Sequence, residues 1–324
     1  MLKKYEQVAQ ELQPHLQEFE NYRTQMLAKT LERKLLIVAY IVFILIATLV
    51  IVTQNISLPI PFPFLGIIVA VIFVVFVVYH QSAVLDYRGE FKSKIIDAMI
   101  KAINPELNYA KDYCISQKEF YESGIFTTSI DRYNGEDWVK GRIGETDFEF
   151  SEIHAEHKSQ RRDSKGNTKT TYHTIFKGLF MKADFHKHFS GETYVLTDTA
   201  ERYFGFIGKA MQKVSTRGHL VYLENPLFEK EFAVYSTDEV EARYLLSLNM
   251  LERILELKQK FDTNVQLSFV DTDIHIAISN LDILEIKMKQ SLLDQAPILR
   301  CYTELCMCFD IINDLNLNTR IWTK

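Results

Sequence analysis

Two long apolar runs constrain this chain more than any other feature of its sequence. Residues 35–52 and 62–79 each contain 18 consecutive positions without Asp, Glu, Lys, Arg or His. A helix of that length covers about 27 Å, close to the roughly 30 Å hydrocarbon core of a bilayer. Neither run has the polar stripe that a buried globular helix carries. We therefore expect a transmembrane hairpin over 35–79.

The residues around the two runs orient this hairpin. The connection 53–61 is uncharged and contains Pro59 and Pro61, which suits a tight turn at the far membrane face. Basic residues lie instead at the outer ends, at Arg23, Lys29, Arg33, Lys34, Arg88, Lys92 and Lys94. Because such residues favour the cytoplasmic side, both termini are expected there. Without an ionisable residue inside either run, the hairpin is expected to anchor the chain rather than to transport.

Amphipathic helices are predicted on both sides of the hairpin, over 1–34 and 80–104. Their apolar stripes are Tyr5, Val8, Leu12, His15, Phe19, Tyr22 and Met26 in the first and Val84, Tyr87, Phe91, Ile95, Met99 and Ile103 in the second. These heptad-like stripes predict antiparallel pairing within the chain, coiled-coil pairing between subunits, or packing of both helices on the soluble domain. Pro14 is expected to kink or split the first helix.

Residues 105–324 are predicted to form a cytoplasmic α+β domain on a mostly antiparallel sheet. Alternating apolar residues predict strands at 145–152, 175–185, 193–197, 219–223 and 231–236, and a hairpin formed by 265–270 and 274–278. Asp238 is expected to begin a helix whose buried face is Val240, Tyr244, Leu248, Leu251 and Leu255. The helix 291–315 is expected to bury an apolar stripe, Ile298, Cys301, Leu305, Cys308, Phe309 and Ile312. Strands followed by helix, hairpin and helix are typical of the α+β class.

Composition and motifs exclude several classes of function. The net charge of −5 argues against nucleic-acid binding, which needs a basic face. The sequence has no P-loop, no G-x-S-x-G, no H-E-x-x-H and no dinucleotide fingerprint, so no cofactor is expected. Four cysteines, Cys114, Cys301, Cys306 and Cys308, do not form an extracellular disulfide framework. The buried stripe of 291–315 favours structural roles for Cys301 and Cys308.

Three groups of polar residues are candidates for a site. Asp184, His186 and His188 alternate along a predicted strand and are the candidates for a metal site, although a solvent-facing strand surface is the favoured interpretation. Carboxylates could supply an acid/base pair for an enzyme, and these are Glu136, Asp137, Glu145, Asp147, Glu149 and Glu152. The predicted loop 156–171 is basic through Lys158, Arg161, Arg162, Lys165 and Lys169, which suits a surface for anionic lipids or a partner. A hairpin loop without a special role is the alternative.

Several strings together resemble the bacterial membrane proteins catalogued as domain of unknown function 3137. They are Tyr133–Asp137, Gly144–Glu152, Phe176–Phe180, Ala183–Phe185, Leu223–Pro226, Val234–Asp238 and Asn318–Lys324. The likeness extends over nearly the whole chain. It implies a bacterial inner-membrane protein without an established activity, and a LemA-type membrane protein as candidate partner. One departure is His186, where the family pattern has Asn.

These observations favour a non-enzymatic interaction or scaffolding module at the cytoplasmic membrane face, with membrane lipids, a LemA-type protein or a second copy as partners. One alternative is a membrane-bound enzyme that uses the acidic and His residues. The other is a sensor of anionic lipid through 156–171.

Overall fold

The computed structural model describes residues 3–53, 70–75, 78, 85–162, 168–197, 217–315 and 317. The chain divides into two compact units. The helical unit contains Tyr5–Met99 and Glu285–Arg300, and the sheet unit contains Met1–Lys4, Ile100–Leu284 and Cys301–Lys324.

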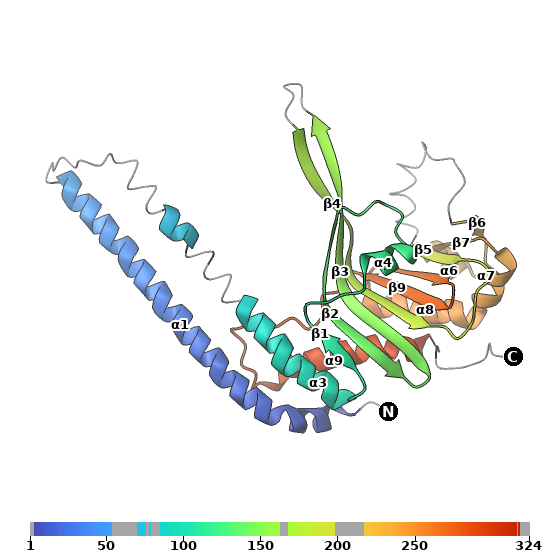
Figure 1. Cartoon of the computed structure of the whole chain (residues 1–324), viewed down its shortest axis with the longest axis horizontal. Helices are drawn as coiled ribbons and strands as arrows, with labels where there is room; N and C mark the ends of the chain where they lie inside the picture. The colour runs from blue at the N-terminus through green and yellow to red at the C-terminus, as the bar shows by residue number, and fades with distance from the viewer. Residues whose placement is uncertain are drawn as a thin grey trace. The chain divides into compact units, whose positions relative to one another are not determined.

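The helical unit is built on one long helix, α1 (Tyr5–Thr53), drawn in blue in Figure 1. Pro14 was expected to kink or split this helix; it lies inside α1, so the helix is not split there. A proline removes one backbone hydrogen bond. Apolar side chains on both sides of Pro14 are buried and hold the helix together across it, namely Val8, Leu12, Leu16 and Phe19. His15 is exposed, and Leu16 takes its predicted place in the buried stripe.

A second helical segment lies antiparallel beside α1 (Figure 1). It is helical over 85–91 and continues through a π-helical turn, η1 (Lys92–Ile96), into α3 (Asp97–Ile103). The ring of Phe19 lies 5.5 Å from that of Tyr87 and 6.0 Å from that of Phe91. Tyr87, Phe91, Ile95 and Met99 are fully buried. Antiparallel pairing within the chain, one of the three predicted arrangements, is therefore observed.

The apolar run 35–52 lies within α1, and most of its described side chains are exposed to solvent. Leu36, Phe43 and Leu49 are 69%, 67% and 63% exposed. Of the run 62–79, only 70–75 and 78 are described. Among the described residues, no helix has the length and apolar character that a membrane span requires.

The sheet unit confirms the predicted α+β class. Over the described residues its sheet has nine strands in the order β1-β2-β3-β4-β9-β8-β5-β7-β6, and every adjacent pair is antiparallel. The strands are β1 (Asn108–Ala110), β2 (Arg132–Ile143), β3 (Thr146–Arg162), β4 (Thr168–Asp184), β5 (Thr193–Thr197), β6 (His219–Val221), β7 (Phe232–Ser236), β8 (Val265–Val270) and β9 (Asp273–Ser279). The helices are α4 (Gln117–Glu122), α6 (Pro226–Glu231), α7 (Glu239–Leu245), α8 (Leu248–Phe261) and α9 (Gln295–Asp314).

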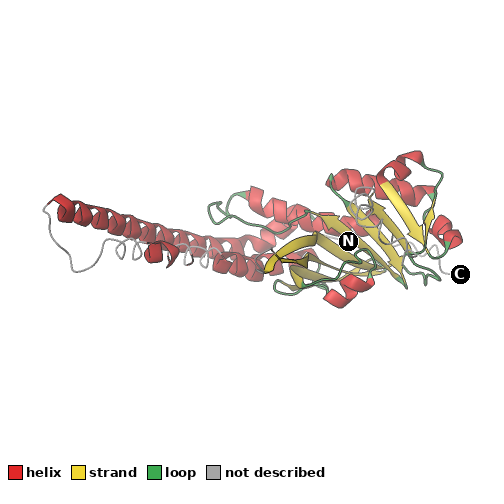
Figure 2. Ribbon diagram, turned by 90° about the horizontal axis from the view of Figure 1, so that it is seen from above, coloured by secondary structure: helices red, strands yellow, loops and turns green. Residues whose placement is uncertain are grey.

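Helices cover both faces of this sheet (Figure 2). On one face, Phe309 of α9 packs against Phe148 and Phe150 of β3, with ring centroids 5.8 and 6.0 Å apart. On the other face, Phe120 of α4 packs against Phe176 and Phe180 of β4, at 5.8 and 5.0 Å. Because both faces are buried, β3 and β4 have large apolar side chains on both sides.

The helix predicted to begin at Asp238 differs from the observed structure in two ways. Asp238 caps α7 as expected, because its carboxylate accepts a hydrogen bond from Glu241 N at 3.0 Å. The helix, however, is broken at Leu246 and Ser247 into α7 and α8. Its predicted buried stripe is only partly correct: Leu251 is buried, whereas Val240, Tyr244 and Leu248 are 79%, 61% and 65% exposed. The residues that face the core are Ala242, Leu245, Leu251 and Ile254.

Candidate interaction groove

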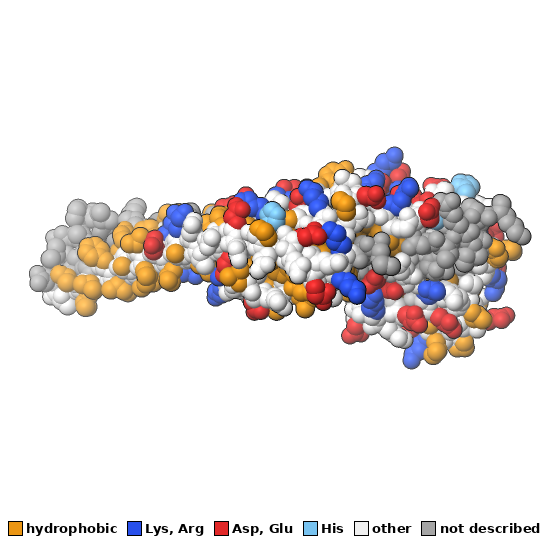
Figure 3. All heavy atoms as spheres, turned by 90° about the horizontal axis from the view of Figure 1, so that it is seen from below, with side chains coloured by type: hydrophobic (Ala, Val, Ile, Leu, Met, Phe, Trp, Pro, Cys, Tyr) orange, Lys and Arg blue, Asp and Glu red, His pale blue; other side chains and the backbone are white. Residues whose placement is uncertain are grey.

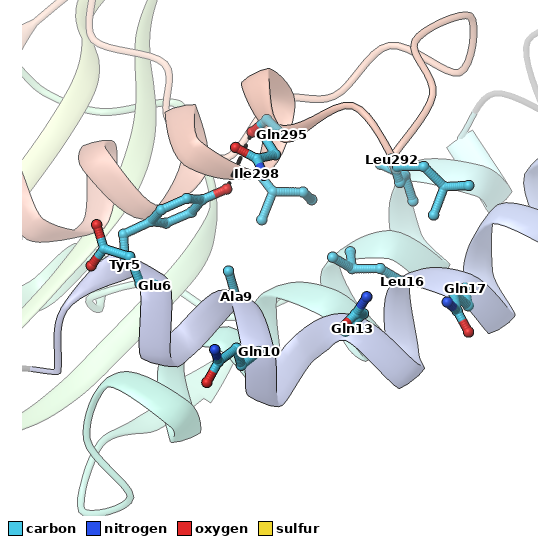
Figure 4. Close-up of a pocket in the computed structure, with 11 residues that line it drawn as sticks. Tyr5, Glu6, Ala9, Gln10, Gln13, Leu16, Gln17, Leu292, Gln295 and Ile298 are labelled. Carbon is cyan, nitrogen blue, oxygen red and sulfur yellow. Dashed lines mark hydrogen bonds between the residues drawn. The ribbon is translucent and has the colours of Figure 1, made fainter.

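A groove of about 430 Å³ lies within the helical unit, between the first turns of α1 and residues 292–298. Figure 4 shows both walls. Tyr5 closes one end, where its hydroxyl donates a hydrogen bond to Gln295 O at 3.4 Å. The α1 wall consists of Tyr5, Glu6, Ala9, Gln10, Gln13, Leu16 and Gln17, and the opposite wall consists of Leu292, Leu293, Gln295 and Ile298.

The walls combine an apolar floor with a polar rim. Leu16, Leu292 and Ile298 are buried at 9%, 1% and 1% exposure. Gln10, Gln13, Gln17 and Gln295 are exposed, and their carboxamides provide both donors and acceptors. Leu293 is 60% exposed beside the floor. Such a surface suits a peptide or helix that inserts apolar side chains and pairs its polar groups with neutral amides.

A buried ion pair fixes the wall that faces α1. The Glu20 carboxylate accepts hydrogen bonds from Arg23 Nε at 2.8 Å and Arg23 Nη2 at 2.6 Å. It also accepts from Ser291 Oγ at 2.8 Å and Leu292 N at 3.0 Å. Arg23 Nη1 donates to Met288 O at 3.0 Å. Glu20 and Arg23 therefore hold 288–292 against α1, and Leu292 in turn forms part of the groove.

These contacts set the charge state of Glu20. The hydrogen bonds from Arg23, with those from Leu292 and Ser291, outweigh the effect of burial and lower the pKa of Glu20 from 4.5 to about 2. A carboxylate whose pKa is lowered by folding stabilises the fold above its unfolded pKa. This stabilisation is complete above about pH 4.5 and is lost as the pH falls toward about 2. The pair is thus fully ionised at neutral pH.

The basic residues predicted as a lipid or partner surface lie on β3 and β4. Lys158, Arg161 and Arg162 are in β3 and Lys169 is in β4, so these residues belong to strands and not to the predicted loop. Lys165 lies outside the described residues. The strands continue because β3 and β4 pair as far as Arg162↔Thr168.

Asp184, His186 and His188 do not alternate along one strand. β4 ends at Asp184, and His186 has a left-handed backbone with φ 56°. Its Nδ1 lies 3.0 Å from Asp184 Oδ2, whereas His188 is exposed. In the part of the chain that the structure describes, no group of three or more His, Cys, Asp or Glu side chains is arranged to hold a metal ion.

The acidic candidates have separate partners. Asp147 accepts two hydrogen bonds from Arg142, both at 2.6 Å, and Glu149 accepts one from Trp138 Nε1 at 2.8 Å. Asp137 is fully buried and accepts a hydrogen bond from the Tyr109 hydroxyl at 2.6 Å. None of these carboxylates lines the groove or the smaller pocket beside β6.

Residues 174–317 match the family model described as "Protein of unknown function (DUF3137)". The predicted DUF3137 resemblance is confirmed over these residues, which are less of the chain than expected. The DUF3137 match begins within β4 and includes β5 to β9 and α9. Of the strings that suggested the family, Tyr133–Asp137, Gly144–Glu152 and Asn318–Lys324 lie outside it.

Two further comparisons add little to the DUF3137 match. No curated protein matches the sequence. The crystal structure of the mycobacterial trehalose monomycolate transport factor A, TtfA, is 10% identical and aligns with 64% of this chain and 88% of that chain at a TM-score of 0.31. A TM-score this low supports no conclusion about fold or function.

Proposed function

We propose that this chain is a membrane-anchored interaction module without enzymatic activity. In this proposal 35–52 and 62–79 form the hairpin in the inner membrane, both termini lie in the cytoplasm, and the groove of the helical unit binds a partner.

The observation that carries the anchor is the apolar surface of α1. Between Leu35 and Val50, large apolar side chains are exposed over most of the helix circumference, including Leu35 at 62%, Leu45 at 62% and Ile46 at 57%. Figure 3 shows hydrophobic atoms gathered along this part of the chain. A continuous apolar surface of this kind marks a membrane or protein contact. Burial of each such side chain contributes about 1.5–3 kcal/mol, so exposure to water is unfavourable.

The ends of this surface support the orientation. Lys29, Arg33 and Lys34 precede the apolar run, whereas 53–61 contains no charged residue. Basic residues near a span are retained on the cytoplasmic side. The same arrangement leaves the groove on the cytoplasmic side, because its α1 wall precedes Lys29 in the sequence.

The groove carries the interaction part of the proposal. Its occupant is inferred to be a segment with apolar side chains from a second membrane protein, for which the family resemblance suggests the LemA type. A second copy of the chain is the alternative occupant. The separate, already paired positions of Asp147 and Glu149 support a binding role over the enzyme alternative.

Co-purification tests this function. The full chain, extracted in mild detergent, is expected to bring down one partner chain in a stable ratio. Leu293→Asp should abolish binding of that partner, because it places a charge beside the apolar floor. Leu227→Asp is the matched control, since Leu227 is 70% exposed on the sheet unit and should leave the partner bound. Recovery of a partner-free monomer in every condition, or equal loss in both variants, would contradict the proposal.

A further inference from the structure

The hairpin of β3 and β4 extends beyond the rest of the sheet (Figure 1). β2 pairs with β3 only as far as Arg132↔Glu156, and β9 pairs with β4 only over Gly178–Asp184. Beyond these points β3 and β4 continue to pair with each other, from His157↔His173 to Arg162↔Thr168. We call 157–162 and 168–173 the ribbon. It is a two-stranded structure whose faces are not covered by other described strands.

Basic side chains are concentrated on this ribbon. It contains Lys158, Arg161, Arg162 and Lys169 and no Asp or Glu, although the whole chain has a net charge of −5. Arg161 and Lys169 are directly opposite each other in the register and therefore share one face. Lys158 and Arg162 have the opposite parity on β3 and share the other face. Cations thus lie on both faces of the ribbon.

The pairing of Arg161 with Lys169 has an energetic consequence. Like charges at directly opposite positions destabilise an antiparallel pair. Among the residues of the ribbon no carboxylate is present to offset this repulsion. An external anion between the two side chains would do so. Hydroxyl groups are close along the same face, where Ser159 and His173 contact each other at 2.9 Å and Thr171 lies opposite Ser159.

The aromatic content of the ribbon favours lipid over nucleic acid. Binding to single strands uses exposed aromatic rings on which bases stack. Tyr172 is the one Phe, Tyr or Trp of the ribbon, and the Arg132 guanidinium already lies 3.4 Å from the centre of its ring. The other polar groups of the ribbon include cationic side chains and hydroxyls, which can bind the phosphates of lipid headgroups. We propose that the ribbon binds the anionic headgroups of the membrane in which the chain is anchored.

The expected strength follows from the number of charges. A basic residue near an anionic bilayer contributes about 1 kcal/mol, so loss of two should weaken contact by about 10- to 30-fold. The attraction should weaken as salt rises, because charges are screened over about 8 Å at physiological ionic strength. The inference rests on the proposed anchor, which tethers the chain to the bilayer.

Energy transfer from the ribbon to the membrane tests the inference. The full chain carries a fluorescent amino acid at exposed Gln160 and is reconstituted in nanodiscs with an acceptor on the lipid headgroups. Discs of phosphatidylcholine with phosphatidylglycerol should give higher transfer than phosphatidylcholine alone. Arg161→Gln with Lys169→Gln should remove that difference. The matched control, Lys118→Gln with Lys230→Gln, removes two exposed lysines elsewhere on the sheet unit and should retain it.

Three outcomes would overturn the inference: equal transfer in both lipids, equal transfer in both double variants, or binding of a single-stranded oligonucleotide that depends on Arg161 and Lys169. Failure of the anchor is a separate result, because the chain would then not enter the discs. The same fluorophore would in that case be read on addition of vesicles, so the ribbon is tested in either case.

Discussion

Glu20→Gln is expected to release 288–292 from α1 and to open the groove. The substitution leaves the Arg23 guanidinium, in a residue that is 7% exposed, without its carboxylate partner. Breaking a buried pair on one side costs about 3–5 kcal/mol. Amide hydrogen exchange of 288–292 at neutral pH should accelerate by about 100-fold or more, since each 1.36 kcal/mol corresponds to a factor of ten.

Glu18→Gln is the matched control for this prediction, because Glu18 is an exposed glutamate on the same helix. Its exchange over 288–292 should equal that of the unmodified chain. Arg23→Gln should accelerate exchange over 288–292 as Glu20→Gln does. The destabilisation of this segment in the double variant should be smaller than the sum of the two single destabilisations. Indistinguishable exchange in the Glu18 and Glu20 variants would show that the pair does not hold this wall.

Phe309→Ala is expected to lower the free energy of unfolding of the sheet unit by about 3–5 kcal/mol. Phe309 is fully buried, and its ring contacts both Phe148 and Phe150. Truncation leaves a cavity between α9 and β3 that neighbouring aromatic rings cannot fill without moving. Denaturant unfolding of the full chain in detergent, followed by the circular dichroism of the sheet, measures the loss.

Tyr222→Ala provides the comparison, because this aromatic residue of the sheet unit is 67% exposed. Its effect should stay within about 0.5 kcal/mol, as for most surface substitutions. Phe309→Leu should lower the free energy of unfolding much less than Phe309→Ala, since leucine retains most of the buried volume. Equal losses for Phe309→Ala and Tyr222→Ala would mean that α9 does not pack on β3 as described.

Strands with regular alternation were predictable from the sequence. β8 and β9 lie within a residue of the predicted 265–270 and 274–278, and the predicted buried stripe of α9 is buried throughout. β2 was not predicted, because it contains Gly135 and Gly141 and an irregular register between Glu136 and Val139, where buried Asp137 has φ 59°. Pairing with β1 and β3 compensates for its weak intrinsic preference.

Periodicity alone did not identify the buried side of α7, and in α8 it identified only Leu251 among the buried residues. Val240, Tyr244 and Leu248 have helical spacing, but so do Ala242 and Leu245, and spacing does not indicate which set meets the sheet. The break at Ser247 also separates the two helices, so one continuous stripe could not serve both. The exposed set is therefore an apolar surface and not part of the core.

The groove could not be predicted because its walls are far apart in the sequence, at 5–17 and 292–298. Its glutamines resemble the solvated side of any amphipathic helix, and Glu20 with Arg23 resembles an ordinary surface pair three residues apart. Glu20 and Arg23 differ from a surface pair only because the folded chain brings Ser291 and Leu292 into hydrogen-bond distance of Glu20. The basic residues of the ribbon, by contrast, are evident from their clustering in the sequence.

Fractionation of the full-length protein tests the membrane anchor most directly. A detergent-free lysate is centrifuged at high speed, and the pellet is washed with alkaline carbonate to remove peripheral proteins. Two apolar segments inserted in lipid should keep the chain in the washed pellet until detergent is added. Recovery of the intact chain in the first supernatant would contradict the anchor.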